Sequence, residues 1–125
     1  MREDKVLVVE DDPSIAGAVE KAGERLQLQV EVATDGWDAI EKLRCADYAA
    51  IVIDSEVPRS SGFGVITWLR QEIGDDLGNV VLMTSAEEVP ARRTISEQLH
   101  VIPRTDVVED LALAVQECVA AALRS

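Results

Sequence analysis

The stretch Ile51-Val52-Ile53-Asp54-Ser55-Glu56-Val57-Pro58 decides the fold, because in it an apolar run ends abruptly at a carboxylate. Residues 49–53 are apolar without alternation, which is typical of a strand buried on both faces in a parallel sheet covered by helices. Asp54 would then lie at the carboxyl end of this strand, where open α/β sheets bind ligands. Asp54 is therefore a candidate functional residue by position, although an aspartate there can also open a turn or cap a helix.

Four other runs have the length of a strand, and each strand-like run is followed by a segment with some helical periodicity. Residues 29–33 alternate polar and apolar side chains, which indicates a half-exposed edge strand. The segment at residues 89–98 contains Pro90 and few apolar residues, so we expect a short or irregular fourth helix. Five strands that alternate with five helices predict a doubly wound parallel sheet. The expected strands are residues 5–9, 29–33, 49–53, 80–83 and 99–102.

Length and charge restrict the class of protein. The 125 residues suit a single domain, expected over residues 1–125, and no apolar run approaches the ~20 residues of a membrane span. The chain shows no secretory leader, so the cytoplasm is the expected location. Twenty-four acidic and 12 basic residues give a net charge of −12, which argues against nucleic-acid binding and favours protein partners.

The cysteines and tryptophans are expected to serve packing. Cys45 and Cys118 lie in helix-like segments without the spacing of a zinc site, so buried free thiols are expected. Trp37 and Trp68 also lie in helix-like segments with apolar neighbours, which favours packing over a binding role.

Acidic residues follow two of the predicted strands. If the strand order is the flavodoxin-like 2-1-3-4-5, strands one and three are neighbours, and their carboxyl ends bring together Glu10, Asp11 and Asp54. Three carboxylates so close repel one another and require a cation. Hard oxygen ligands that stay open to water suit Mg²⁺ or Mn²⁺ better than zinc. A carboxylate in such a site can act as a nucleophile and form an acyl phosphate.

The motifs together resemble a known family. Val8-Val9-Glu10-Asp11-Asp12-Pro13, Ile53-Asp54, Pro58 four positions later and Gly62 eight positions later are similar to the receiver domain of bacterial two-component response regulators. The similarity covers essentially the whole chain. It implies that Asp54 is the phosphoacceptor in a Mg²⁺-dependent step.

The resemblance also implies the metal ligands and the residues that respond to phosphate. Asp11 would ligate Mg²⁺ directly and Glu10 through water, and the backbone carbonyl of Glu56 would be a further ligand. Ser85 would be the hydroxyl that turns toward the phosphoryl group, with Thr84 the less favoured alternative. In the family this movement shifts the face formed by the fourth helix, fifth strand and fifth helix.

Glu56 and Glu87 match the two positions that tune the lifetime of the phosphoryl group in receivers. We expect both side chains to flank the site.

Two positions depart from the family pattern and make this receiver atypical. Ile102 stands before Pro103, where the family carries a lysine, and Leu99 stands where a switch aromatic is usual. Arg104 or His100 are the candidate substitutes for the missing cation, although the longer, forked arginine would need some rearrangement. The resemblance suggests a cis bond between Ile102 and Pro103, and the sequence leaves this open.

Three hypotheses for function follow. The first is a stand-alone receiver that accepts a phosphoryl group on Asp54 from a histidine kinase or phosphotransfer protein and signals to a downstream protein, with weak homodimer formation left open. The second is a degenerate receiver that binds partners independently of phosphate, which Ile102 motivates. The third is an aspartyl-phosphate phosphohydrolase, for which Glu56 would be the second acid, but the chain lacks a cap insertion or a basic substrate-binding cluster. In the first two the protein is a signalling domain and not an enzyme.

Overall fold

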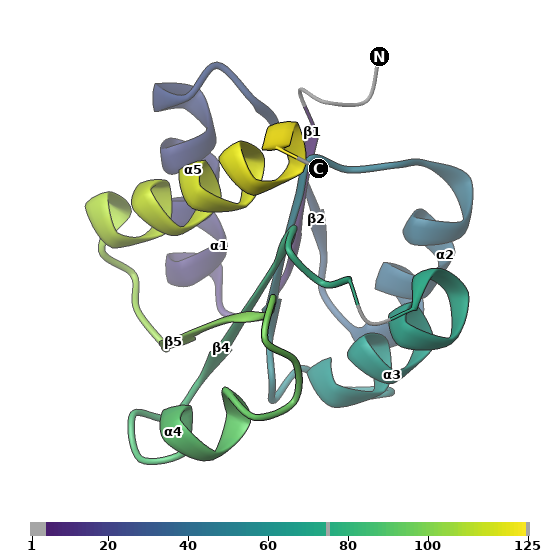
Figure 1. Ribbon diagram of the computed structural model, residues 1–125. Coiled ribbons are helices and arrows are strands. Elements are labelled where there is room, and N and C mark those ends of the chain that lie inside the picture. Colours follow the sequence, from purple (N-terminus) through teal and green to yellow (C-terminus); the bar gives the residue numbers. More distant parts are fainter. Residues whose placement is uncertain (1–4, 75, 125) are drawn as a thin grey trace.

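The computed structural model describes residues 5–74 and 76–124, the last three of these by their backbone alone, and it confirms the predicted fold class. The sheet has five parallel strands in the order β2-β1-β3-β4-β5, and helices alternate with the strands along the chain (Figure 1). The elements are β1 (Lys5–Val9), α1 (Pro13–Arg25), β2 (Gln29–Ala33), α2 (Gly36–Cys45), β3 (Ala50–Asp54), α3 (Gly62–Ile73), β4 (Val80–Thr84), α4 (Val89–Arg92), β5 (His100–Pro103) and α5 (Val108–Arg124).

Alternation along the strands builds two cores, one on each face of the sheet. In β3 the side chains of Ile51 and Ile53 belong to the core under α2 and α3, whereas Ala50 and Val52 belong to the core under α1 and α5. Figure 1 shows these helix pairs on opposite sides of the sheet. Both faces of β3 are buried, as its unbroken apolar sequence predicts.

Helix α1 begins where the sequence predicts. Asp12 is the N-cap, and its carboxylate accepts a hydrogen bond from the N–H of Ser14 at 2.9 Å, while Pro13 occupies the first turn. Ile15 and Val19 are buried against the sheet. The cap fixes the point at which the chain leaves the acidic end of β1.

Helix α4 is a single turn, which confirms the expectation of a shortened fourth helix. Within the described residues, none of the helices combines the length and the apolar character that crossing a membrane requires.

Two packing predictions are wrong. The side chain of Trp37 is 64% exposed, because it lies on the outer face at the start of α2, whereas Trp68 packs against the core as expected. Cys45, at the end of α2, is exposed, and only Cys118 is a buried free thiol.

A polar cluster ties β2 to the segment that precedes β3. The hydroxyl of Tyr48 donates to Oε1 of Glu31 at 2.6 Å, and Nζ of Lys5 lies 2.9 Å from Oε2 of the same carboxylate. The hydrogen bonds from Tyr48 and Lys5 hold the pKa of Glu31 below its ordinary value of 4.5. The cluster therefore stabilises the fold most when Glu31 is charged.

We predict that Tyr48→Phe lowers the free energy of unfolding by about 1 kcal/mol at pH 7, and by less at pH 3. Because folding lowers the pKa of Glu31, its stabilisation is complete above pH 4.5 and is lost as the pH falls through the folded-state pKa. Urea unfolding at the two pH values measures this difference. In a Glu31→Gln background the effect of Tyr48→Phe should not depend on pH, and an equal effect at both pH values in the natural chain would contradict the prediction.

Candidate functional site

Four polar side chains converge at the carboxyl edge of the sheet. Asp54 ends β3, and Glu10, Ser85 and Arg104 each come one residue after the end of β1, β4 or β5. Backbone hydrogen bonds continue the strand pairing past these ends, from Glu10 N–H to the carbonyl of Ala33 at 2.9 Å and from Arg104 N–H to that of Thr84 at 2.8 Å. Side chains alternate along a strand, so the four share the face of Val8, Val52, Met83 and Ile102, which pack toward α1 and α5.

The guanidinium of Arg104 donates two hydrogen bonds to the carboxylate of Asp54. Its Nε donates to Oδ2 at 2.9 Å and its Nη2 donates to Oδ1 at 2.8 Å. Oδ1 also accepts the N–H of Glu56 at 2.9 Å, and the Asp54 residue is only 4% exposed. Of the two candidate substitutes for the missing lysine, Arg104 reaches Asp54, whereas Nε2 of His100 lies 3.2 Å from the carbonyl oxygen of Gly78. Paired, parallel hydrogen bonds of this kind are the strong form of a salt bridge.

The pKa values of the two buried carboxylates in the site are shifted in opposite directions. Burial alone would raise the pKa of Asp54, but hydrogen bonds from Arg104, Glu10 and the backbone of Glu56 outweigh burial and hold that pKa below its ordinary value. Burial, followed by the hydrogen bond and charge of Asp54, raises the pKa of Glu10 to about 8. The surroundings therefore favour the neutral form of Glu10 and the charged form of Asp54.

Glu10 carries the feature that bears on a metal. Its Oε2 accepts the N–H groups of Asp11 at 3.1 Å and of Asp12 at 3.3 Å, but its Oε1 is buried without a hydrogen-bond donor. A buried carboxylate oxygen without a donor, on a side chain that interacts with Asp54, fits either a proton or a hard cation, so the donor set suits Mg²⁺.

The expected convergence of three acids is met by two of them. Glu10 and Asp54 interact directly, but Asp11 is exposed. Within residues 5–74 and 76–124, no three acidic, histidine or cysteine side chains come close enough to form a metal-binding group.

The two candidate hydroxyls have different partners. The hydroxyl of Thr84 is fully buried and accepts a hydrogen bond from Ser55 at 3.3 Å. The hydroxyl of Ser85 donates to Oε1 of Glu88 at 3.1 Å. Sequence reasoning missed Glu88, although the spacing Ser-x-x-Glu from Ser85 to Glu88 is the signature of a capping box and could have indicated the pair. Glu87, proposed to flank the site, is exposed.

The remaining positions complete the edge. Ile102 packs against the core under α1 and α5, and the peptide bond to Pro103 is trans. Gly62 lies directly against the acceptor, because a Cβ there would come within 2.3 Å of the carbonyl oxygen of Asp54. A glycine is therefore required for α3 to begin this close to β3.

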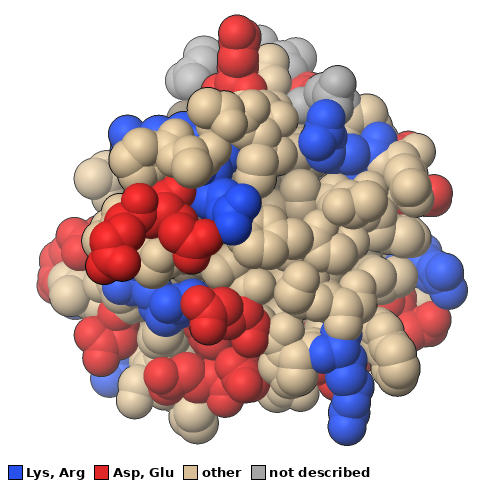
Figure 2. Space-filling view, turned by 90° about the horizontal axis from the view of Figure 1, so that it is seen from below, with Lys and Arg blue, Asp and Glu red and all other residues tan. Residues whose placement is uncertain are grey.

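Figure 2 views the molecule from below Figure 1, the side on which α4 follows β4, and acidic side chains gather there with basic side chains between them.

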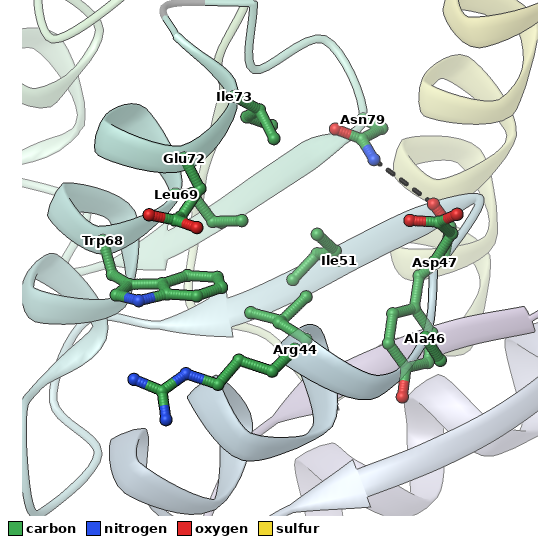
Figure 3. A pocket seen from close by; sticks show the side chains of 11 residues that line it. Arg44, Ala46, Asp47, Ile51, Trp68, Leu69, Glu72, Ile73 and Asn79 are labelled. Carbon is green, nitrogen blue, oxygen red and sulfur yellow. Dashed lines mark hydrogen bonds between the residues drawn. The ribbon is translucent and has the colours of Figure 1, made fainter.

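A hollow of about 520 Å³ lies elsewhere in the molecule, between α2 and α3. Tyr48 and Asn79, which line it, precede β3 and β4, so it opens at the amino ends of these strands, opposite the carboxylates. Figure 3 shows Trp68, Leu69 and Ile51 around this hollow. We therefore place the candidate functional site at the carboxylate edge and not at this hollow.

Comparisons with known proteins agree with this site. The model of the response regulator receiver domain family matches residues 6–100, so the match stops before Ile102 and Arg104. The response regulator MprA of Mycobacterium ulcerans is 32% identical over 88 residues, which cover 70% of this chain and 37% of that protein. The chain spans less than half the length of the curated relatives MprA, LuxQ and CutR.

Solved receivers share the fold. The chemotaxis response regulator CheY4 of Vibrio cholerae superposes with a TM-score of 0.77 at 24% identity, covering 91% of this chain and 97% of the other. The response regulator TrrA of Thermotoga maritima, solved in complex with Mg²⁺ and beryllofluoride, gives 0.76 at 19% identity, covering 92% and 98%. Because the family model matches residues 6–100, most of its length, the chain belongs to the response regulator receiver domain family of two-component signalling.

Proposed function

We propose that Asp54 accepts a phosphoryl group from a histidine kinase or phosphotransfer protein, and that Arg104 supplies the positive charge that a lysine supplies elsewhere in the family. The paired hydrogen bonds between Arg104 and Asp54 carry the proposal, because they put a permanent cation on the acceptor carboxylate. The low pKa of Asp54 supports it, since the nucleophile is ionised at neutral pH.

The residues that would hold Mg²⁺ are Glu10, Asp54, Asp11 and, through its backbone carbonyl, Glu56. When bound, the metal ion would neutralise charge on the phosphoryl oxygens during transfer. Glu10 supports this assignment most directly, because its side chain interacts with Asp54 and its Oε1 is buried without a hydrogen-bond donor.

In the transfer step, a carboxylate oxygen of Asp54 attacks phosphorus and forms a new O–P bond. The bond from phosphorus to the donor's histidine nitrogen breaks, its electron pair stays on the nitrogen, and the nitrogen takes up a proton. Arg104 must release the attacking oxygen, after which its donors can turn to the phosphoryl oxygens, which suit the same forked geometry. A guanidinium on the flexible end of a long side chain is able to make this exchange.

A second candidate function is a receiver that binds partners independently of phosphate. The observation that favours it is the same contact: Arg104 occupies both oxygens of Asp54, in a residue that is 4% exposed. The phosphohydrolase hypothesis loses support, because Oε2 of Glu56 lies 3.5 Å from Nη2 of Arg104 and is paired with a cation instead of being free to act as a general acid.

We predict that the protein becomes phosphorylated on Asp54 when incubated with Mg²⁺ and acetyl phosphate. Intact-mass spectrometry should show the addition of one phosphoryl group, and Asp54→Asn should show none. If the natural chain gains no mass and its spectra do not change with Mg²⁺ and beryllofluoride, the phosphate-independent function replaces the proposal.

We predict that Arg104→Ala slows this phosphorylation by roughly ten- to hundredfold, because a preorganised cation at the developing charge is lost. Arg104→Lys should recover part of the rate. Arg25→Ala is the matched control, since Arg25 forms an exposed ion pair with Glu109 at 3.2 Å, on α1 and α5. A rate that rises in Arg104→Ala would mean that Arg104 blocks the acceptor.

A further inference from the structure

A chain of contacts leads from the predicted switch hydroxyl through α4 to α3. The hydroxyl of Ser85 donates a hydrogen bond to Oε1 of Glu88 at 3.1 Å. Oε2 of Glu88 accepts a hydrogen bond from Nη2 of Arg92 at 2.7 Å. The guanidinium of Arg92 lies over the ring of Phe63, with its Cζ 4.4 Å from the ring centroid. Glu88 precedes α4, Arg92 ends α4 and Phe63 lies in the first turn of α3, so the contacts join three segments beside the acceptor edge.

Glu88 is a strong acceptor for the Ser85 hydroxyl. Hydrogen bonds from Arg92 and then from Ser85 hold the pKa of Glu88 below its ordinary value, so the carboxylate is charged at neutral pH. The N–H of Glu88 also donates to the carbonyl of Ser85 at 3.0 Å, which keeps the two residues in one tight turn. A charged acceptor held this close competes effectively for a hydroxyl.

The Ser85 hydroxyl faces a choice between two acceptors. It has one proton to donate. If the alternation of β4 continues past Thr84, Ser85 shares the face of Met83, which is also the face of Val52 and hence of Asp54. A phosphoryl group on Asp54 would offer strong acceptor oxygens near this hydroxyl. Thr84 does not offer an alternative donor on that face, because its hydroxyl is buried with Ser55 on the other face.

Few contacts separate the Ser85 hydroxyl from helix α4. Helix α4 is one turn long, so its orientation depends on few contacts. Leu99, the residue before β5, stands where a switch aromatic is usual in the family. Among the described residues, Arg92 is the side chain that connects the acceptor of the Ser85 hydroxyl to a neighbouring helix by a ring contact.

We propose that Glu88 is a positioning residue that holds the Ser85 hydroxyl in the unphosphorylated state, and that phosphorylation transfers this hydroxyl to the phosphoryl group and releases Glu88, so that the signal leaves through Arg92 and Phe63. The inference rests on the proposed function, since it requires a phosphoryl group on Asp54. It assigns the control of the switch to residues that flank α4 and not to an aromatic residue on β5.

The test is a titration with Mg²⁺ and beryllofluoride, followed by backbone amide signals in NMR spectra of the full chain. In the natural protein, the amide signals of Glu88, Val89, Ala91, Arg92 and Phe63 should shift. Glu88→Ala removes the competing acceptor and should lower the half-saturating concentration of beryllofluoride by about two- to tenfold. Glu88→Gln retains an uncharged acceptor, so its half-saturating concentration should lie between those of the natural protein and of Glu88→Ala.

The Ser85→Ala background separates this effect from simple removal of a negative charge. If Glu88 acts through Ser85, Glu88→Ala has no effect in that background, whereas a general charge effect would persist. Glu97→Ala, an exposed acid in the segment after α4, controls for net charge, and thermal unfolding checks that each variant folds.

The outcomes separate the two proposals. A natural protein that does not respond to beryllofluoride overturns both the proposed function and this inference. A normal response, with Glu88→Ala unchanged or with its effect persisting in Ser85→Ala, overturns the inference alone.

Discussion

The site depends on how two carboxylates are kept side by side in a nearly dry place. Two unit negative charges 4 Å apart repel by about 4 kcal/mol at an effective dielectric constant of about 20, and burial adds the cost of lost hydration. Two features of the molecule reduce this repulsion: the pKa of Glu10 is raised, which favours its neutral form, and Arg104 places its positive charge on Asp54. The same arrangement leaves Oε1 of Glu10 buried without a hydrogen-bond donor, as a site that takes either a proton or the proposed metal ion would require.

The sheet makes this arrangement possible. Parallel strands end at one edge, and the two-residue alternation along each strand sends Glu10, Asp54 and Arg104 to one face of it. A shift of one residue in the pairing of β5 would turn Arg104 to the opposite face. The hydrogen bond from Arg104 N–H to the carbonyl of Thr84 fixes this register at the point where the guanidinium is needed.

Sequence alone predicts the fold and part of the site. The unbroken apolar runs before Glu10 and Asp54 determine a doubly buried parallel sheet, and the acids at their ends follow from it. The Arg104 contact could be proposed but not established, because a long side chain has many rotamers and only its neighbours select one. The sequence also places Asp11 with these acids, and in the structure it follows Glu10 directly and is exposed, so its part in the site depends on a side-chain conformation that the sequence does not determine.

The cation at the acceptor is attached to a different segment here than a lysine before Pro103 would be. If Asp54 is phosphorylated as proposed, its single negative charge would be replaced by a group that carries nearly two, so Arg104 would be drawn further toward the acceptor. A lysine before Pro103 would transmit that pull to strand β5 itself. Arg104 instead begins the loop into α5, in which the hydroxyl of Thr105 accepts the N–H of Val107 at 3.0 Å, one residue before the helix starts. On this proposal, a guanidinium drawn toward Asp54 would pull on the entry to α5, whereas the contact of Ser85 with Glu88 would act on the entry to α4.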